Sequence, residues 1–253
     1  MKMHILSGGR LRMKKSIYLP EAERSDTIDL PVSCFLLRHS QGNVLFDTGC
    51  HPSVHTDAEA RWGGMAKAMV PIADPAENVV TELQRLGLTP DDIDVVVNSH
   101  FHPDHCGCNE YFTQAVVVCH QHELAAAEAP NAVSQGFLAV EWRHPMPIQT
   151  IAGEHDVFGD GRIVLIPVPG HTPGTITAVV SLDRSGAFVL ASDAVALRSH
   201  IERENCPRNT WNVDLAMQSM AEIRRMESDG AKVIYGHDLA QWETLRKGAA
   251  FYE

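Results

Sequence analysis

The sequence predicts an α/β fold in which two β-sheets pack together with helices on their outer faces. Short strands rich in β-branched residues recur along the chain, for example at residues 95–97, 163–168 and 187–190, and helices and a hairpin lie between them. A chain of 253 residues, 44% of them hydrophobic, is long enough to bury a sizeable core. No internal repeat, low-complexity tract or long linker divides it, so we expect a single domain over residues 1–253.

The first part of the chain is expected to form strands. The apolar runs at residues 32–37 and 43–46 are separated by Ser40-Gln41-Gly42, which is typical of a hairpin. Residues 51–73 show no clear periodicity and are expected to be irregular. Within that segment, residues 62–69 carry a tryptophan and methionines, so a lid over a pocket, a dimer contact and simple packing all stay open.

Two amphipathic helices are predicted. The first begins at Asp74, with Pro75 at its first position and Glu77 completing a capping box, and it ends at Gly87. The second covers residues 212–228, where apolar side chains recur near helical spacing.

Four predicted strands are each followed by a residue of a metal-binding type. The strand at 95–97 leads to His100, and the strand at 163–168 leads to His171. The strands at 187–190 and 232–235 lead in the same way to an aspartate and a histidine, namely Asp193 and His237. In layered α/β folds, functional residues gather beyond the carboxyl ends of strands, which distinguishes these residues from the other histidines.

A histidine-rich motif follows the strand at 95–97. The segment SHFHPDHCG, residues 99–107, contains the pattern H-x-H-x-D-H. Imidazole and carboxylate groups bind borderline divalent metals, and a single catalytic zinc takes only three protein ligands and a water. The motif and the strand ends therefore predict two metal sites, and one carboxylate can bridge them. The candidate ligands are His100, His102, Asp104, His105, His171, Asp193 and His237.

Composition excludes several classes of function. A formal net charge of −11 disfavours a nucleic-acid backbone or an anionic membrane surface as partner. The six cysteines form no C-x-x-C pair, and reduced thiols are expected. The first ten residues lack the apolar region of a secretory signal, and no apolar run approaches membrane-spanning length, so we expect a cytoplasmic enzyme.

The chain resembles the metallo-β-lactamase superfamily and, within it, the N-acyl homoserine lactone lactonases and related lactonases. The residues that carry the resemblance are Leu30-Pro31-Val32, Asp47-Thr48-Gly49, the motif at 99–107, Pro169-Gly170-His171-Thr172-Pro173-Gly174, Asp193 and Gly236-His237-Asp238. The resemblance implies an αββα four-layer sandwich with a dinuclear metal site. It further implies one metal on His100, His102 and His171, a second on Asp104, His105 and His237, and Asp193 as the bridge.

The same resemblance implies the chemistry. Two divalent ions are expected, zinc first, with manganese, iron or cobalt also suited to these ligands. A hydroxide shared by the ions attacks the carbonyl of a small-molecule lactone, which one metal polarises. Asp104 is the catalytic residue that passes a proton to the leaving alkoxide, and Asp47 orients a ligand from behind.

One position departs from the family pattern. The lactonases usually carry a tyrosine three residues after the bridging aspartate, and here that position is Ala196. Arg198 and His200 follow closely and are candidates for the missing hydrogen-bond donor, beside the alternative that both are ordinary surface-loop residues. The departure weakens the assignment to homoserine lactones specifically.

Two other functions remain as alternatives to a lactone hydrolase. A glyoxalase-II-like thioesterase would rely on basic residues near the C-terminus, where Arg246 and Lys247 occur. A non-catalytic metal-binding module would keep the ligands without turnover. Either a monomer or a homodimer is expected.

Overall fold

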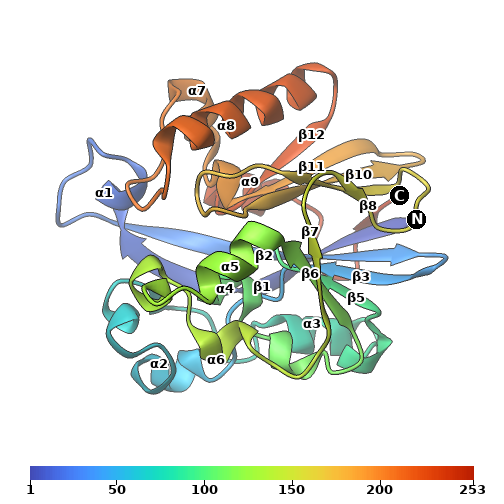
Figure 1. Cartoon of the computed structure of the whole chain (residues 1–253), viewed down its shortest axis with the longest axis horizontal. Helices are drawn as coiled ribbons and strands as arrows, with labels where there is room; N and C mark the ends of the chain where they lie inside the picture. Colours follow the sequence, from blue (N-terminus) through green and yellow to red (C-terminus); the bar gives the residue numbers. More distant parts are fainter.

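The computed structural model describes all 253 residues as two β-sheets packed face to face with helices on both outer faces (Figure 1). The first sheet consists of β1 (Lys2–Lys14), β2 (Thr27–His39), β3 (Gly42–Phe46), β4 (Val70–Pro71), β5 (Val95–Val97), β6 (Val116–His120), β7 (Ile148–Ile151) and β13 (Phe251–Tyr252). Its strand order is β13-β1-β2-β3-β5-β6-β7, and β4 pairs with β1. The expected αββα arrangement is confirmed.

The second sheet has five strands in the order β12-β11-β10-β9-β8. They are β8 (His155–Asp156), β9 (Ile163–Pro167), β10 (Ile176–Leu182), β11 (Gly186–Ser192) and β12 (Lys232–Tyr235). Strands β9, β11 and β12 run in one direction, because β10 is antiparallel to both β9 and β11 while β12 is parallel to β11. Their carboxyl ends therefore meet at one edge of the sheet.

The helices are mostly short. They are α1 (Lys15–Tyr18), α2 (Val54–Trp62), α3 (Val79–Arg85), α4 (Pro103–Cys106), α5 (Gln121–Ala127), α6 (Ala139–Trp142), α7 (Arg198–Arg203), α8 (Val213–Ser228) and α9 (Leu239–Thr244), with 3₁₀ turns η1 (Gly63–Lys67), η2 (Pro90–Asp92), η3 (Asn109–Tyr111), η4 (Ala132–Gln135) and η5 (Asp193–Val195). In Figure 1, α7 and α8 cover the second sheet, and α2, α3 and α6 lie beyond the first. None of these helices combines the length and apolar character needed to cross a membrane.

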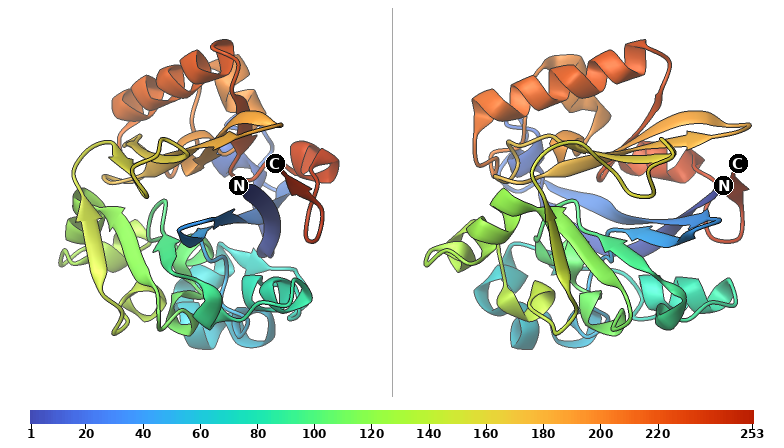
Figure 2. Two further views of the ribbon diagram at one scale, coloured as in Figure 1. Left: turned by 90° about the vertical axis from the view of Figure 1, so that its right-hand side faces the viewer. Right: turned by 45° about the vertical axis from the view of Figure 1, so that its right-hand side comes forward.

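The two sheets share one core, and the first sheet is buried on both faces. Phe35 and Leu37 of β2 pack into the cluster between the sheets, whereas Cys34 and Leu36 pack into the cluster beneath α3. Alternate residues of a strand point to opposite faces, so burial on both sides requires the continuous apolar run that the sequence shows. The chain ends also belong to this sheet, because β1 pairs with β13, and Figure 2 shows the two termini side by side.

Several expected elements are confirmed. β2 and β3 form the predicted hairpin, closing on the pair of His39 and Gly42. The predicted helix at 212–228 is α8, and the Asn212 side chain caps it by accepting the backbone N–H of Leu215 at 3.1 Å. All six cysteines are free thiols.

The predicted start of the first helix is wrong. α3 begins at Val79, and its cap is Asn78, whose side chain accepts the N–H of Thr81 at 3.0 Å. Asp74 instead accepts the N–H of Ala76 in a turn that precedes the helix. Glu77 cannot complete a capping box because its carboxylate accepts from the hydroxyl of Ser7 at 2.9 Å. The cap therefore lies four residues later than predicted, directly before the buried residues Val79 and Leu83.

The prediction that residues 51–73 are irregular is also wrong. They form α2, η1 and β4. α2 has a non-helical backbone at Asp57, and only Val54 and Trp62 among its residues are buried. A kink and two buried positions leave no helical periodicity, which explains why the sequence pattern missed the helix.

A bulge in β1 brings this strand against the loop after β3. The pairing of β1 with β2 shifts register between Ser7 and Arg10. A Cβ on Gly49 would lie 2.4 Å from the Cα of Gly8, so only two glycines allow the backbones to approach so closely. The Gly8 carbonyl accepts the N–H of Cys50 at 2.8 Å. This contact holds the Asp47–Gly49 loop beside the segment that carries His105, where the N–H of Thr48 donates to the carbonyl of His105 at 2.8 Å.

Candidate metal centre

The polar residues that follow four strands lie together at one edge of the core. His100 follows β5 of the first sheet, and His171, Asp193 and His237 follow β9, β11 and β12 of the second. The backbone N–H of residue 176 donates to the carbonyl of residue 99 at 2.9 Å, which joins the two sheets at this edge. The expectation that strand ends bring these residues together is therefore met by the geometry.

The histidine motif divides at Pro103, the first residue of α4. His102 has an extended backbone, and the α4 turn then carries Asp104 and His105. The N–H of His105 donates to the carbonyl of His102 at 2.9 Å, which closes the turn. Proline suits this position because its fixed φ matches the first turn of a helix and its missing N–H is not needed there.

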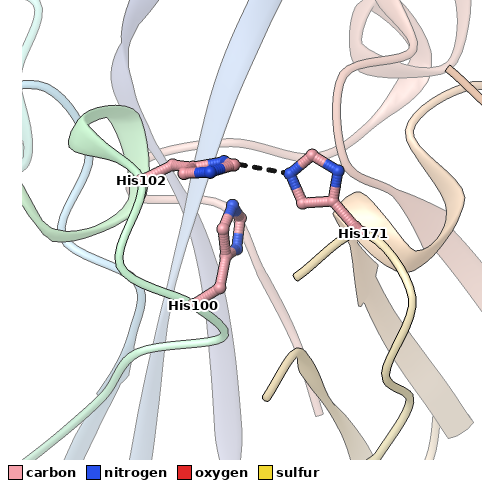
Figure 3. Close-up of side chains that lie close together, drawn as sticks. All are labelled: His100, His102 and His171. Atoms are coloured by element: carbon pink, nitrogen blue, oxygen red, sulfur yellow. Dashed lines mark hydrogen bonds between the residues drawn. The ribbon is translucent and has the colours of Figure 1, made fainter. Parts of the chain in front are cut away.

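His100, His102 and His171 form one group of side chains that face one another (Figure 3). His171 Nε2 lies 3.0 Å from His102 Nδ1. The ring of His100 lies 4.7 Å from that of His102 and 4.9 Å from that of His171, measured between centroids. The other ring nitrogen of His102 lies 3.1 Å from the carbonyl of Gln135, which orients the ring.

Asp104, His105 and His237 form a second group. Asp104 Oδ2 lies 3.6 Å from His105 Nε2 and 3.7 Å from His237 Nε2. The backbone supports this group from the side, because the N–H of His237 donates to the carbonyl of Ala196 at 2.8 Å.

Asp193 lies between the two groups. Its Oδ2 is 3.2 Å from His171 Nε2 in the first group. Its Oδ1 is 2.9 Å from His237 Nε2 and 3.4 Å from His105 Nε2 in the second. The preceding residue, Ser192, has a φ of 46°, a conformation unusual for a side-chain-bearing residue, and strain of this kind is found at functional sites. The structure thus brings all seven predicted residues together.

The unsatisfied atoms of these side chains fit a bound metal. Nε2 of His100, His105 and His237 and Oδ1 of Asp193 are buried, and none of them forms a hydrogen bond of good geometry, although His237 Nε2 lies 2.9 Å from Asp193 Oδ1. Buried polar atoms are almost always paired, and an unpaired one costs about 1–3 kcal/mol. These atoms converge on the same space and belong to the ligand types that borderline divalent ions prefer, so the donor set fits such ions.

Burial and charge give the two groups different protonation. Burial lowers the pKa of His171 to about 3, which keeps its imidazole neutral and able to bind a metal. Burial would also lower the pKa of His105, but nearby carboxylates, Asp104 first, raise it well above its usual range. Burial would raise the pKa of Asp193, but the surrounding histidines hold it well below its usual range. A dication would supply the positive charge that these carboxylates attract.

Hydrogen bonds behind the second group fix its rings. Asp47 Oδ2 lies 2.8 Å from His105 Nδ1, in agreement with the expectation that Asp47 orients a ligand. The carboxylate also accepts the N–H of Ser99 at 2.7 Å and its hydroxyl at 2.8 Å. His237 Nδ1 lies 2.9 Å from the carbonyl of Pro31. Such contacts select the tautomer that points Nε2 into the site.

Neither residue suggested to replace the family tyrosine faces the site. Arg198 is exposed and its guanidinium pairs with Glu202 at 3.0 Å. His200 is fully buried, and its Nε2 lies 2.9 Å from the backbone carbonyl of Tyr18. His200 is therefore a structural residue of the core, and the description of it as a surface-loop residue is wrong.

Tyr18 is a buried neighbour of the second group that the sequence did not reveal. Its ring lies edge-on to that of His237, 6.5 Å between centroids, and it packs in one cluster with Ala196. Burial raises its pKa well above the usual range, and the charges of Asp193 and Asp104 raise it further. The hydroxyl has only the sulfur of Met13 as partner, at 3.5 Å, which is a weak acceptor. No local pattern marks a tyrosine in a four-residue helix as part of this site.

A cavity of about 880 Å³ opens beside the first group. His102 and His171 are among the residues that line it. Its lining also includes apolar side chains, namely Met13, Ile17, Trp62, Met65, Phe137 and Trp211. Residues 62–69 form one wall of this cavity, and Trp62 and Met65 also pack in the core cluster that contains Tyr18, so pocket lining and simple packing both describe this segment.

Comparisons with known proteins agree with the fold. The sequence model of the Metallo-beta-lactamase superfamily matches residues 27–244. An N-acyl homoserine lactonase, AttM, of Azorhizobium caulinodans is 28% identical over 260 residues, which cover 100% of this chain and 98% of the relative.

Two solved structures show the same fold. An N-acyl homoserine lactone hydrolase with N-hexanoyl-L-homoserine bound at its catalytic metal centre superposes with a TM-score of 0.89 at 24% identity, covering 99% of this chain and 98% of that one. AidC, a dizinc quorum-quenching lactonase, superposes with a TM-score of 0.70 at 17% identity, covering 98% and 92%. With a match over most of its length, the chain belongs to the metallo-beta-lactamase superfamily.

Proposed function

We propose that this protein is a metal-dependent hydrolase that opens the ester ring of a lactone, an N-acyl homoserine lactone or a related compound. The observation that carries the proposal is a pair of ligand groups that share one carboxylate, Asp193. The lactonase activity named for the relatives supports the substrate class.

Two divalent ions, zinc in the first place, are proposed to occupy the site. His100, His102 and His171 would hold one, and Asp104, His105 and His237 the other, with Asp193 bound to both. When bound, such ions generate a nucleophile from water at neutral pH and polarise a carbonyl oxygen. Manganese, iron and cobalt also suit these ligands.

Asp104 is proposed to transfer a proton to the leaving group. Its Oδ2 faces His105 and His237, which leaves Oδ1 to take the proton that water loses when it becomes the nucleophile. When the ring C–O bond breaks, the alkoxide oxygen takes that proton, and the product is a hydroxy acid. At 6% exposure, the carboxyl is sheltered from bulk water.

The cavity is proposed to bind the acyl part of the substrate. Apolar side chains of Met13, Ile17, Met65 and Phe137 line it, together with the rings of His102 and His171. Burying a methylene group contributes about 0.8 kcal/mol, so an acyl chain would gain affinity with length until the cavity is filled.

A hydrolysis panel tests the proposal. A pH indicator would report acid release from acyl homoserine lactones of increasing chain length, simple γ-lactones, aromatic lactones and thioesters. We expect lactone turnover, with kcat/KM rising about threefold to fourfold per added methylene over short chains. Purified, metal-loaded protein that releases acid from no lactone would contradict the proposal.

The same panel decides between the alternatives. Faster turnover of thioesters than of lactones would favour a glyoxalase-II-like enzyme. The structure offers little for that reading, because Lys247 donates to the backbone carbonyl of Leu245 and Arg246 packs on the ring of Tyr252, outside the cavity lining. Metal binding without any turnover would favour the non-catalytic module.

Tyr18 is proposed to donate to the substrate oxygen on which negative charge develops. Tyr18→Phe is expected to lower kcat about a hundredfold with little change in KM, because a donor of this kind acts in the transition state. Steady-state kinetics on the best lactone would measure the split. Tyr111→Phe is the control, since that hydroxyl contacts His51 away from the cavity. Equal kcat for Tyr18→Phe and wild type would exclude the role.

We further propose that residues 1–253 form one domain and that the protein acts in the cytoplasm. The pairing of β1 with β13 ties both ends of the chain into the first sheet, which supports a single unit. Six free thiols are consistent with a reducing compartment. Whether the protein acts as a monomer or a homodimer stays a prediction to be measured.

A further inference from the structure

A buried carboxylate outside the two ligand groups has no cation beside it. Glu123 of α5 is fully buried, and it takes part in no ion pair. Burial raises its pKa to about 7, although three hydrogen bonds lower it. Burying an acid without a positive partner destabilises a fold compared with an apolar side chain of similar size. Packing alone therefore does not explain a glutamate at this position.

The three hydrogen bonds come from two loops that are far apart in the sequence. Glu123 Oε1 accepts the N–H of Phe101 at 2.9 Å. Its Oε2 accepts the hydroxyl of Thr172 at 2.6 Å and the N–H of Gly174 at 3.0 Å. Phe101 stands between His100 and His102, and Thr172 follows His171. One carboxylate thus ties together both backbone segments that carry the rings in Figure 3.

Close packing adds to these bonds. A Cβ on Gly174 would lie 2.3 Å from the backbone nitrogen of Glu123, so the loop rests directly on α5. Within the loop, the hydroxyls of Thr172 and Thr175 lie 2.7 Å apart, and the N–H of Thr172 donates to Thr175 Oγ1 at 3.0 Å. The Thr172 hydroxyl is therefore held in one orientation toward the carboxylate.

We propose that Glu123 is a positioning residue that sets the geometry of the His100, His102 and His171 group and with it the affinity for one metal ion only. The inference rests on the proposed two-metal site. The second group has other supports, because Asp47 contacts His105 and the Pro31 carbonyl contacts His237. Loss of the Glu123 carboxylate should accordingly leave the second site intact.

Metal titration tests the assignment without using activity. Metal-free protein is titrated with Co²⁺ in competition with a chelator, and absorbance reports each bound equivalent; His171→Ala identifies the equivalent of the first group. Glu123→Gln is expected to weaken that equivalent about tenfold to a hundredfold and to leave the other unchanged. Thr172→Val should act in the same direction, whereas Thr172→Ser, which keeps the hydroxyl, should bind like wild type.

Glu141→Gln is the matched control. Glu141 is also fully buried, but it pairs with Arg61 at 2.8 Å and accepts from the indole of Trp62. The Glu141→Gln substitution should lower the melting temperature and leave the affinity for each of the two metal equivalents unchanged. If Glu123→Gln binds both metal equivalents as tightly as wild type, or binds both of them equally weakly, the role inferred for Glu123 is wrong and the two-metal proposal is unaffected. Wild-type protein that binds no second equivalent would contradict the two-metal proposal itself.

Discussion

Asp193→Asn is expected to lower kcat/KM about a thousandfold or more. The amide has the shape of the carboxylate, but it carries no charge and offers only one oxygen, so it cannot serve both ligand groups. Asp193 contacts His171 through one oxygen and His237 through the other, and the substitution breaks that symmetry. Loss of about 4 kcal/mol of transition-state stabilisation, within the range that metal ions supply, corresponds to this factor.

The measurement pairs kinetics with metal content. We expect Asp193→Asn to retain fewer than two equivalents of metal after purification, with a circular dichroism spectrum like that of wild type. Asp91→Ala is the control, because Asp91 is an exposed residue of η2. Turnover within tenfold of wild type by Asp193→Asn would exclude a bridging carboxylate that the reaction requires.

Removal of bound metal is expected to abolish lactone turnover and to lower the melting temperature by roughly 10 °C. A ligand present at about a thousand times its Kd stabilises the folded state by about 4 kcal/mol, and in a chain of this size each kcal/mol shifts the melting temperature by about 2–4 °C. The physical cause lies in the buried nitrogens of His100, His105 and His237, which form no hydrogen bond of good geometry in the absence of metal.

Calorimetry and activity before and after treatment with a chelator test this result. Added Zn²⁺, Mn²⁺ or Co²⁺ should restore both properties, while Mg²⁺ should not, because magnesium prefers oxygen ligands in an octahedral shell. Full activity of protein shown to contain no metal would contradict the mechanism proposed for the site.

The layers and most of the site were predictable from short stretches of sequence. The apolar run at 32–37 predicted a strand, and it lies within β2, where these residues are buried. The helix at 212–228 was predictable because its apolar face and its Asn212 cap are both local signals. The motif at His100 was informative since metal ligation requires particular side chains at short fixed spacing.

Other features could not be predicted from the sequence, because the contacts that determine them are not local. α2 gave no periodicity, as few of its residues are buried. The start of α3 was misplaced because the cap signal at Asp74 is local, whereas the contact of Glu77 with Ser7, which leaves no capping box there, is not. The substitution at Ala196 pointed to Arg198 and His200, yet neither faces the site.

The family, the two-sheet architecture and the identity of the candidate ligands follow from the amino-acid sequence, because they depend on local hydrophobic patterns and on residue type. The folded chain adds that Asp193 faces both groups, that Tyr18 lies beside His237, and that Glu123 joins two distant loops. These contacts link residues far apart in the chain. Their distances follow from how the strands align at one edge of the core, which no local sequence pattern encodes.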